Sequence, residues 1–515
     1  MSVLTTSLFA SSRPRKIGVG YHNIGSGTHR ASHPSLVKKI EDQYGQRCGH
    51  LPLEAEHVHV LVSIPTTEIK AQLAYLSHLM GKTITALSTQ GCITALRHAA
   101  DPNALVVPYI NVPETEHWIQ EELGATSWGL PGTMVHLLKN KANFHQLLGD
   151  LSLEGFEAPE YTIAPVEAIS QAALSLLHTI EEMVSQAGIT NYPLGVMLRA
   201  AESDGNYGSC LVYENQHRVL LVPDGDVQQA QRCHTWQQAL AAAQHHLASI
   251  MNQQKESRVV ISRFVEVADS PGLSVVILDG QVESLGWNSQ LQEPGSTACV
   301  GTGSYQPKNA ALARLQQATE EQTAFHLEAL LRRTAHICGL DFATLRGVAN
   351  LDLMLPGPQE ERLQKNRGRP PAIYLAECNP RWTNYTDALL TVLAVKRQAP
   401  TISALRTVIQ EGMATVDHYP LPPTVEPRRV RDELLRRNEV LRQAGISIIC
   451  RMTHNPMGFI FAGNVKQARQ ELIRLLARLS TTTTWGWAGG RRDLQSRWEE
   501  EEELSRVVEK TAVLG

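Results

Sequence analysis

Two acidic residues, an asparagine and an arginine carry the strongest chemical signal in this sequence. Glu377, Asn379 and Arg381 lie within the segment 372–382, and Asp352 lies in an earlier apolar segment. Carboxylate and amide oxygens are the ligands that Mg²⁺ prefers, and a guanidinium can bind phosphate through two parallel hydrogen bonds. These residue types together suit a site for magnesium and phosphate.

The segment 372–382 has the pattern of a buried strand that ends in polar residues. Because side chains alternate between the two faces of a strand, we expect four of them on one face: Ile373, Leu375, Glu377 and Asn379. Pro380 has no N–H to donate to a neighbouring strand and is expected to end this one. Arg381 is then the first residue of a loop, directly beside the two oxygen ligands.

A second apolar segment, 348–355, is expected to be the neighbouring strand. The residues between them, 356–371, are rich in Pro, Gly, Lys and Arg and are interpreted as an exposed hairpin loop. When the two strands pair, Asp352 converges with Glu377 and Asn379. The alternative, a pair of solvated edge carboxylates, is disfavoured because both strands are otherwise apolar, and a buried charge without a partner costs on the order of several kcal/mol.

Composition excludes several classes of protein. The 515 residues predict about two to four domains. A net charge of -4 provides no basic field for nucleic-acid binding, and the 8 cysteines include no CxxC pair, which favours reduced thiols in a cytoplasmic protein. No apolar run reaches the roughly 18 residues of a membrane-spanning helix. We therefore expect a soluble cytoplasmic protein without a nucleic-acid or membrane partner.

The order of strand and helix patterns predicts three domains. Residues 1–130 alternate short strands and helices as a small α/β domain, residues 131–420 contain the acidic strands, and residues 421–515 form a small α+β cap followed by a tail. A Pro-rich linker at 419–423 separates the last two. The predicted fold class is therefore α/β and α+β, multidomain. A histidine-rich stretch at 50–59 is interpreted as structural or surface-exposed rather than as a metal cluster.

Two cations and a glycine-containing loop precede the acidic strands. Lys141 lies in an amphipathic helix, where a solvated charge is the simplest interpretation. Arg199 ends a predicted strand, which leads through a loop at 203–208 into a returning strand at 211–213. The tip of such a hairpin can offer backbone N–H groups to phosphate oxygens, although most loops of this kind are only turns.

These features resemble the ATP-grasp superfamily, and within it the pheganomycin-type peptide ligases, which also carry a domain before the ATP-grasp domain. The resemblance covers roughly residues 130–420. Its most specific motif is Asp352 followed by Glu377-x-Asn379-Pro380-Arg381. It implies an ATP-grasp fold with an N-terminal α/β (pre-ATP-grasp) domain and a small C-terminal α+β domain.

The resemblance also implies a role for each matching residue. Asp352, Glu377 and Asn379 would hold the Mg²⁺ ions that bridge the ATP phosphates, and Arg381 would be catalytic, in contact with the transferred phosphoryl group or the acyl phosphate. The resemblance implies three further groups of residues that would bind ATP. Two cations would contact the phosphates: Lys141, and Arg199 in place of the second family lysine. The glycine loop would close over the phosphates with Ser203, Asp204, Gly205, Asn206 and Gly208, and a strand would contact adenine and ribose with Ser262, Arg263, Val265 and Glu266.

The implied activity is that of an ATP-dependent carboxylate-amine ligase of the peptide type. It would form an amide through an acyl phosphate and release ADP and phosphate, with ATP and Mg²⁺ as cofactors. Its substrates would be a small-molecule carboxylate donor and an amine, amino-acid or peptide acceptor. The sequence leaves open whether the protein forms a homo-oligomer. Two alternatives remain: a phosphotransferase-like ATP-grasp enzyme that forms no amide, and a non-catalytic ATP-binding regulator.

Overall fold

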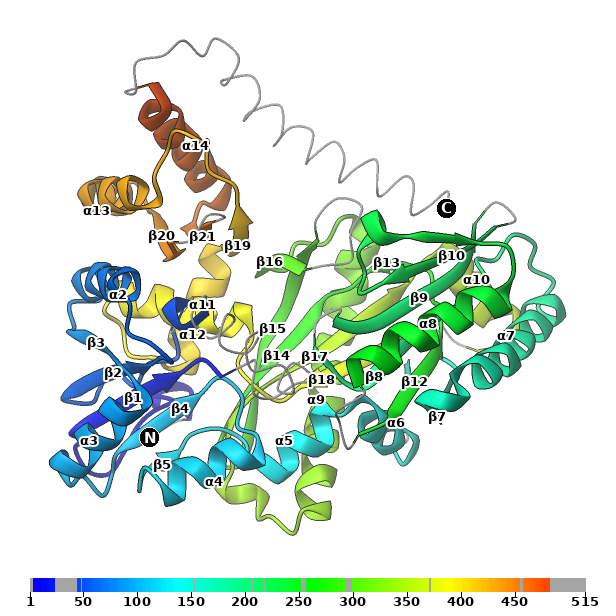
Figure 1. The fold of residues 1–515 in the computed structure, drawn as a ribbon, viewed down its shortest axis with the longest axis horizontal. Helices are drawn as coiled ribbons and strands as arrows, with labels where there is room; N and C mark the ends of the chain where they lie inside the picture. Colours follow the sequence, from blue (N-terminus) through cyan, green and yellow to red (C-terminus); the bar gives the residue numbers. More distant parts are fainter. Residues whose placement is uncertain are drawn as a thin grey trace.

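Three β-sheets organise the part of the chain that the structure describes (Figure 1). The structure is a computed structural model, and it describes residues 3–23, 44–47, 49–151, 153–204, 207–215, 218–251, 256–292, 299–369, 372–453 and 457–481. Among these residues, no helix combines the length and the apolar character needed to cross a membrane. The tail after residue 481, for which the sequence suggests no specific role, lies outside the described residues.

The first sheet is parallel and belongs to the N-terminal part of the chain. Its strand order is β3-β2-β1-β4-β5, with β1 (Ile17–Tyr21), β2 (His57–Leu61), β3 (Ile84–Leu87), β4 (Leu105–Pro108) and β5 (Thr126–Ser127). Parallel neighbours need crossover connections, and helices supply three of them: α2 (Thr67–Met80), α3 (Thr89–Ala99) and α4 (Pro113–Glu121). This arrangement is the α/β layer that the sequence predicts.

The second sheet is antiparallel around its central hairpin. Its order is β11-β10-β9-β8-β12-β7, with β7 (Tyr161–Pro165), β8 (Gly195–Asp204), β9 (Tyr207–Asn215), β10 (Arg218–Pro223), β11 (Gln231–Cys233) and β12 (Arg258–Arg263). Two amphipathic helices, α7 (Ile169–Gln186) and α8 (Trp236–Met251), share an apolar core with these strands. The predicted hairpin around residues 203–208 is β8 and β9.

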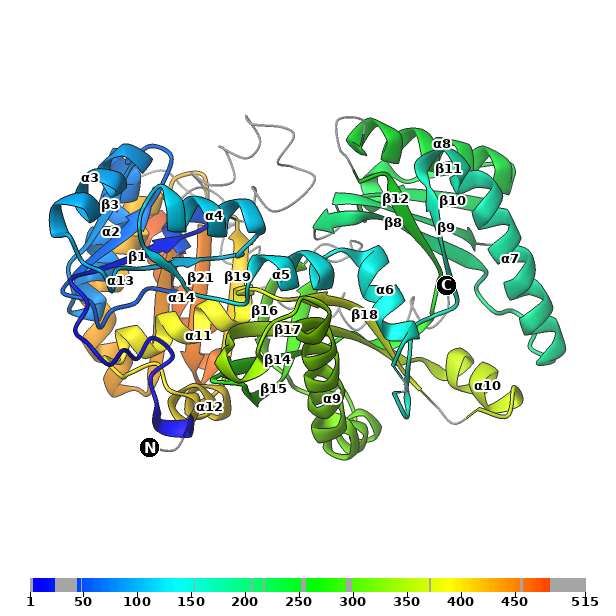
Figure 2. The same cartoon turned by 90° about the horizontal axis from the view of Figure 1, so that it is seen from below.

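The third sheet is the largest, and it lies between the other parts of the molecule (Figure 2). From one edge to the other it contains β20 (Ile446–Met452), β21 (Met457–Gly463), β19 (Met413–Tyr419), β16 (Cys299–Ser304), β15 (Gln281–Gln292), β14 (Gly272–Leu278), β17 (Arg346–Pro356), β18 (Ile373–Asn379) and β6 (Phe156–Glu157), and β13 (Val267–Asp269) pairs with β17. The sheet runs through the predicted domain boundary at residue 420, because β19 pairs with β16 on one side and with β21 on the other.

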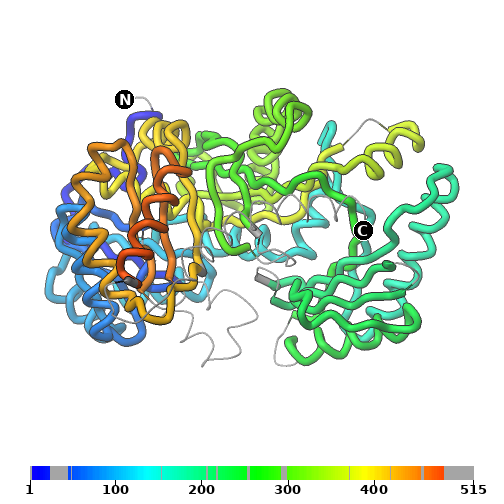
Figure 3. The backbone as a smooth tube through the Cα atoms, turned by 90° about the horizontal axis from the view of Figure 1, so that it is seen from above, coloured from blue at the N-terminus to red at the C-terminus, as the bar shows by residue number. Residues whose placement is uncertain are grey.

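Helices accompany the third sheet: α9 (Ala310–Ile337), α11 (Asn384–Val395), α12 (Ile402–Glu411), α13 (Pro427–Gln443) and α14 (Val465–Thr481). Figure 3 shows that the C-terminal elements lie beside the N-terminal sheet, far from it in the sequence. The backbone N–H of Cys450 donates to the hydroxyl of Tyr75 over 3.1 Å, and the amide of Gln72 donates to the carbonyl of Cys450 over 2.9 Å. The fold class predicted from the sequence, α/β and α+β in several domains, is confirmed.

The segment between β17 and β18 contains a helix, so the prediction of a hairpin loop there was wrong. Helix α10 (Pro358–Asn366) begins two residues after β17 ends. Proline is favoured in the first turn of a helix because its fixed φ suits the helix and its missing N–H has no partner there. The carboxylate of Glu266 accepts hydrogen bonds from the backbone N–H groups of Gln359 (2.7 Å) and Glu360 (3.2 Å), which caps the helix.

Candidate functional site

The two acidic strands pair, and their polar ends meet. In the antiparallel register of β17 and β18, Asp352 lies opposite Glu377 and Asn350 lies opposite Asn379. The side-chain amide of Asn379 donates to a carboxylate oxygen of Asp352 over 3.0 Å and to one of Glu377 over 3.4 Å. The structure therefore brings Asp352, Glu377 and Asn379 together on one face of the sheet.

A β-bulge corrects the predicted alternation along β18. Leu375 pairs with Leu353 while Glu377 pairs with Asp352, so Ala376 is an extra residue in β18. Because paired residues share a face, Leu375 points to the apolar core with Leu353, and Glu377 points to the opposite face. The expectation that Leu375 and Glu377 share one side was therefore wrong, although Glu377 and Asn379 do share one.

Lys141 is buried against Glu377 rather than solvated. It is the first residue of α6 (Lys141–Gly149), which follows α5 (Gly132–Lys139) and is capped by the side chain of Asn140. Its Nζ lies 2.8 Å from Oε2 of Glu377 and donates to the backbone carbonyl of Ser203 over 2.7 Å. With only 3% of its surface exposed, Lys141 joins α6, β8 and β18 at one point.

Arg199 approaches the same carboxylate from β8. Its Nη1 lies 3.8 Å from Oε2 of Glu377, and it donates to the backbone carbonyl of Ala376 over 3.4 Å. Burial lowers the pKa of Arg199, while Glu377 and Asp352 raise it. Two cations from separate elements thus converge on one acid.

The two facing carboxyl groups have opposite pKa shifts. Burial raises the pKa of Asp352, and the neighbouring charge of Glu377 raises it further. Burial also acts to raise the pKa of Glu377, but Lys141 and Arg199 outweigh it and lower the pKa below its usual value. Glu377 is therefore the ionised member of the pair, and ionising Asp352 beside it would place two negative charges together.

Amide groups surround Asp352 on the remaining sides. Gln290 of β15 donates to Oδ1 over 3.1 Å and Asn350 donates to the same atom over 2.7 Å. The amide of Asn288 and the hydroxyl of Ser274 both donate to Oδ1 of Asn350, each over 3.0 Å. Sequence reasoning missed Gln290 and Asn288, because nothing local distinguishes an inward-facing amide on β15 from an exposed one.

Arg381 begins the loop after β18, as predicted, and reaches the N-terminal part of the chain. Its Nη1 donates to the carbonyl of Trp382 over 3.1 Å and to the hydroxyl of Tyr109 over 3.4 Å. Its guanidinium carbon lies 5.5 Å from the centre of the Tyr109 ring. Arg381 thus lies between the acidic strands and the residues that follow β4.

The predicted phosphate loop is described only in part. Gly205 and Asn206 lie outside the described residues, as does the side chain of Asp204. Ser203 is 4% exposed, and its hydroxyl has no hydrogen-bond partner among the described residues. Gly208 has a φ of 82°, which favours glycine, and its N–H donates to Asp224 over 2.8 Å.

The predicted nucleotide strand places its charged side chains away from Lys141 and Glu377. The guanidinium of Arg263, at the end of β12 after Ser262, makes two hydrogen bonds to Glu360 over 2.6 and 3.0 Å and one to Glu160 over 2.7 Å. Glu266 caps α10, and Val265 is buried. The side chains of Glu266 and Arg263 are thus hydrogen-bonded to other residues of the protein.

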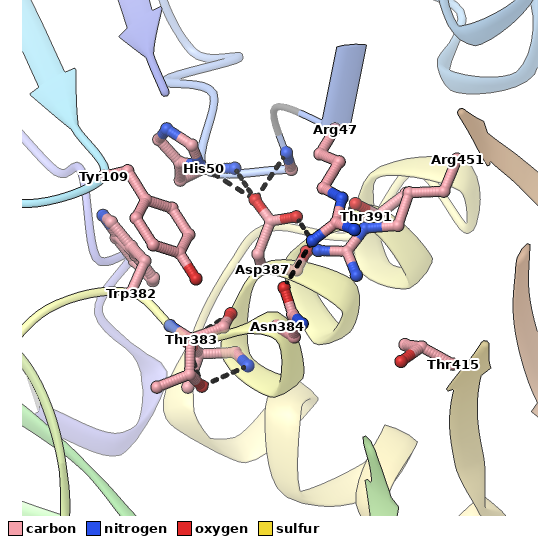
Figure 4. A network of polar contacts seen from close by, with 12 residues as sticks. Arg47, His50, Tyr109, Trp382, Thr383, Asn384, Asp387, Thr391, Thr415 and Arg451 are labelled. Carbon is pink, nitrogen blue, oxygen red and sulfur yellow. Dashed lines mark hydrogen bonds and ion pairs between the residues drawn. The ribbon is translucent and has the colours of Figure 1, made fainter. Parts of the chain in front are cut away.

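A second buried polar cluster, which the sequence does not reveal, lies around the start of α11 (Figure 4). At its centre Asp387 of α11 accepts hydrogen bonds from the backbone N–H groups of Gly49 (2.7 Å) and His50 (3.2 Å), from Nδ1 of His50 (2.8 Å) and from Nη2 of Arg451 (2.5 Å). Burial raises the pKa of Asp387, but Arg451 and His50 lower it well below its usual range.

A second arginine extends this cluster. Nη2 of Arg47 lies 3.2 Å from Asp417 of β19, and its Nη1 donates to Asn384 over 2.7 Å. The cluster therefore connects the N-terminal part of the chain, α11 and the C-terminal strands. Among the described residues, no group of three or more His, Cys, Asp or Glu side chains is placed to hold a metal ion; the predicted triad contains two acids and an amide.

No family model matches the sequence, and no curated protein matches it either. Solved structures with a similar arrangement include the carboxyaminoimidazole ribonucleotide synthase of Aspergillus clavatus complexed with ATP, at 14% identity and a TM-score of 0.43 over 82% of this chain and 98% of that one. A biotin carboxylase from Campylobacter jejuni is similar at 12% identity and a TM-score of 0.49 over 90% of each chain.

The biotin carboxylase domain of the Hydrogenobacter thermophilus 2-oxoglutarate carboxylase, in complex with MgADP, ADP and bicarbonate, is similar at 9% identity and a TM-score of 0.48 over 90% of each chain. At such low identities and scores these similarities carry no argument about activity.

Proposed function

We propose that this chain is an ATP-grasp enzyme, an ATP-dependent carboxylate-amine ligase that forms an amide bond through an acyl phosphate and releases ADP and phosphate. The observation that carries the proposal is the convergence of Lys141 and Arg199 on Glu377, opposite Asp352. Two cations can bind the phosphates of a nucleoside triphosphate, and the two neighbouring acids can bind its metal ion. On this proposal residues 1–130, 131–420 and 421–515 are its three domains, and the last two share the third sheet across residue 420.

The acidic pair suits magnesium on electrostatic grounds. Burial raises the pKa of Asp352 and the charge of Glu377 raises it further, so a divalent cation bound by the two carboxylates would relieve the repulsion. Asn379 directs its NH₂ group at both acids, and a half-turn of the amide would present its oxygen instead. We propose Asp352, Glu377 and Asn379 as ligands; the metal, when bound, would neutralise the β- and γ-phosphates.

The cations and the glycine loop suit the phosphate groups. Lys141 has three N–H donors and Arg199 has five, more than their protein acceptors use. The buried Ser203 hydroxyl has no partner among the described residues, so a phosphate oxygen could accept from it. We assign the loop residues Ser203, Asp204, Gly205, Asn206 and Gly208 to this contact.

Adenine and ribose would lie against the end of β12. We propose Ser262, Arg263, Val265 and Glu266 for this contact, with the backbone of Val265 at its centre. The side chains of Arg263 and Glu266 are engaged with other residues, the N–H of Arg263 donates to the carbonyl of Glu160, and the carbonyl of Glu266 accepts from Gly357. The backbone of an interdomain strand can present both donors and acceptors to a planar base.

In the proposed reaction, a carboxylate oxygen of the donor attacks the γ-phosphorus of ATP, and ADP leaves. Arg381 would stabilise the negative charge on the transferred phosphoryl group and on the acyl phosphate. The amine acceptor, an amino acid or peptide, then attacks the acyl carbon and phosphate leaves. Positioning and charge neutralisation carry the catalysis, so no protein nucleophile is needed.

The test is an incubation of the protein with ATP, Mg²⁺ and a panel of amino acids, with hydroxylamine as a trap. We expect ADP, phosphate and an amino-acid hydroxamate, or a peptide when hydroxylamine is left out. AMP and pyrophosphate would contradict the acyl-phosphate route. ADP with neither hydroxamate nor amide would favour the phosphotransferase-like alternative, and ATP binding without any turnover would favour the regulator.

A further inference from the structure

Two histidines that stack on Tyr109 and Trp382 have ring nitrogen atoms without a hydrogen-bond partner among the described residues. His22 follows β1 and is 3% exposed, and His50 is 0% exposed. Both ring nitrogens of His22 and Nε2 of His50 lack a hydrogen-bond partner among the described residues. The two ring centres are 6.1 Å apart, so these atoms belong to one small region.

Three unpartnered buried nitrogens are costly in a folded protein. Each buried polar atom left without a hydrogen bond costs about 1–3 kcal/mol, and nearly all such atoms in native structures find a partner. A hydrogen-bonding molecule between His22 and His50 would remove this cost. The region therefore has the character of a binding site.

The protonation of the two rings defines which molecule would fit. Burial lowers the pKa of His22 well below its usual value, and His50 and Arg47 lower it further, so His22 is neutral. Asp387 carries a negative charge and accepts from Nδ1 of His50 over 2.8 Å, which fixes the hydrogen of that ring on Nδ1. Nε2 of His50 then carries a lone pair, so it accepts a hydrogen bond.

The neighbouring cations do not convert the region into an anion site. Arg451 is paired with Asp387 over 2.5 Å and with Asp417 over 3.4 Å, and Arg47 is paired with Asp417 over 3.2 Å. Their charges are compensated by carboxylates. Nε of Arg451 also lacks a hydrogen-bond partner among the described residues, so the cluster offers a donor as well as the acceptor Nε2 of His50. This combination suits a molecule that donates N–H groups and also carries an acceptor, such as the amine of an amino acid.

The region also adjoins the proposed reaction centre. Tyr109 stacks on His22 with the ring centres 4.1 Å apart, and its hydroxyl accepts from Arg381 over 3.4 Å. His50 stacks on Trp382, the residue after Arg381, with the ring centres 5.9 Å apart. The two imidazoles thus pack against the two residues, Tyr109 and Trp382, to which Nη1 of Arg381 donates.

We propose that His22 and His50 bind the amine substrate and that Nε2 of His50 accepts its proton; this inference rests on the proposed ligase function. The ammonium form R–NH₃⁺ gives one proton to Nε2. The freed lone pair forms the C–N bond with the acyl carbon, the bond from that carbon to the phosphate oxygen breaks, and phosphate leaves with the electron pair. The remaining excess proton on nitrogen passes to the leaving phosphate, and the imidazolium of His50 loses its proton to water once the products have left the site.

His50→Asn tests this role, because the asparagine amide can still donate to Asp387 while Nε2 is lost. Hydroxylamine is largely unprotonated at neutral pH and needs no base, whereas an amino acid is an ammonium ion. We therefore expect hydroxamate formation to be retained and peptide formation to fall by about 100-fold or more, a typical contribution of a general base. The matched control is His59→Asn on β2, whose Nδ1 contacts Thr85 over 2.6 Å; both rates should stay unchanged.

The outcomes separate the possibilities. Equal losses of hydroxamate and peptide, or no loss of either, would overturn the proposal; the second result would mean that only a structural water occupies the region. If His50→Asn fails to fold, His22→Asn serves instead, with a raised KM for the amine and an unchanged hydroxamate rate as the expected result. Wild-type protein that makes neither product would instead contradict the ligase function itself.

Discussion

Lys141 and Glu377 form a buried ion pair, with Nζ 2.8 Å from Oε2, that joins the start of α6 to the end of β18. The lysine side chain is 4% exposed and the glutamate side chain 19%. Such a pair gains little net stability, because desolvation offsets most of the attraction. Its position beside Asp352 and Arg199 agrees with the phosphate and metal site proposed above.

Lys141→Gln should weaken ATP binding. The substitution removes a charge that would contact the phosphates, and a lost charged contact of about 1.5–3 kcal/mol corresponds to roughly 10- to 150-fold in affinity. Isothermal titration calorimetry with MgATP measures the change. Lys70→Gln on the exposed side of α2 is the control and should bind like wild type; an unchanged affinity in Lys141→Gln would remove the lysine from the site.

Glu377→Gln should abolish turnover while leaving the fold intact. The amide keeps the size of the side chain but cannot supply the charge that a magnesium ion and Lys141 require. Initial rates of ADP release, together with far-UV circular dichroism, check both halves of this statement. Retained activity would exclude Glu377 from the metal site.

Mg²⁺ should bind in a manner that depends on Asp352. Saturating Mg²⁺ with a non-hydrolysable ATP analogue should raise the melting temperature of the wild type, and EDTA should reverse the shift, because a ligand that binds only the folded state stabilises it. In Asp352→Asn, most of the Mg²⁺-dependent increase in melting temperature should be lost. An equal shift in wild type and variant would show that the metal is held elsewhere.

Acid should weaken the fold partly through Glu160. Burial would raise its pKa, but hydrogen bonds and ion pairs from Arg263 and Arg367 lower it to about 2. A depressed folded-state pKa stabilises the protein above the unfolded value near 4.3, and this stability is lost as the pH falls toward 2.

Glu160→Gln should therefore lower the melting temperature at pH 7 and have a shrinking effect as the pH falls below 4. Thermal melts at a series of pH values measure this, with the exposed Glu167→Gln as control. A difference between wild type and Glu160→Gln that stays constant down to pH 2.5 would contradict the assignment.

Asp387→Asn should destabilise the protein strongly. It would leave the buried Arg451 beside a neutral group and disturb the contact with His50. Breaking a buried pair by neutralising one partner typically costs about 3–5 kcal/mol. Urea unfolding of wild type and variant gives the value, and a change below about 1 kcal/mol would show that Arg451 is satisfied by Asp417 alone.

Local patterns predicted the acidic strands but not their detailed geometry. The alternation in β18 placed Glu377 and Asn379 on one face correctly, yet the bulge at Ala376 depends on the register with β17, which no local pattern encodes. Helix α10 was missed because its many charged residues resemble a loop. Local patterns do not predict contacts between residues far apart in the sequence, such as Asp387 and His50, which are 337 residues apart.

The burial of Lys141 illustrates the same limit. Its sequence context fits a solvated charge on a helix surface, and only the packing of α6 against β8 and β18 reveals the ion pair. The resemblance singled out Lys141, whereas the local pattern did not. Residues on β15 such as Gln290 carry no comparable signal, and they become visible only when the sheet is assembled.

The transfer of a carboxylate oxygen to phosphate tests the acyl-phosphate route most directly. Amino acids labelled with ¹⁸O in the carboxylate are incubated with the protein, ATP and Mg²⁺, and the phosphate released is analysed by mass spectrometry. We expect one ¹⁸O in the inorganic phosphate, because the carboxylate oxygen becomes the bridge of the acyl phosphate and leaves with phosphorus. Unlabelled phosphate alongside amide product, or ¹⁸O in AMP, would contradict it.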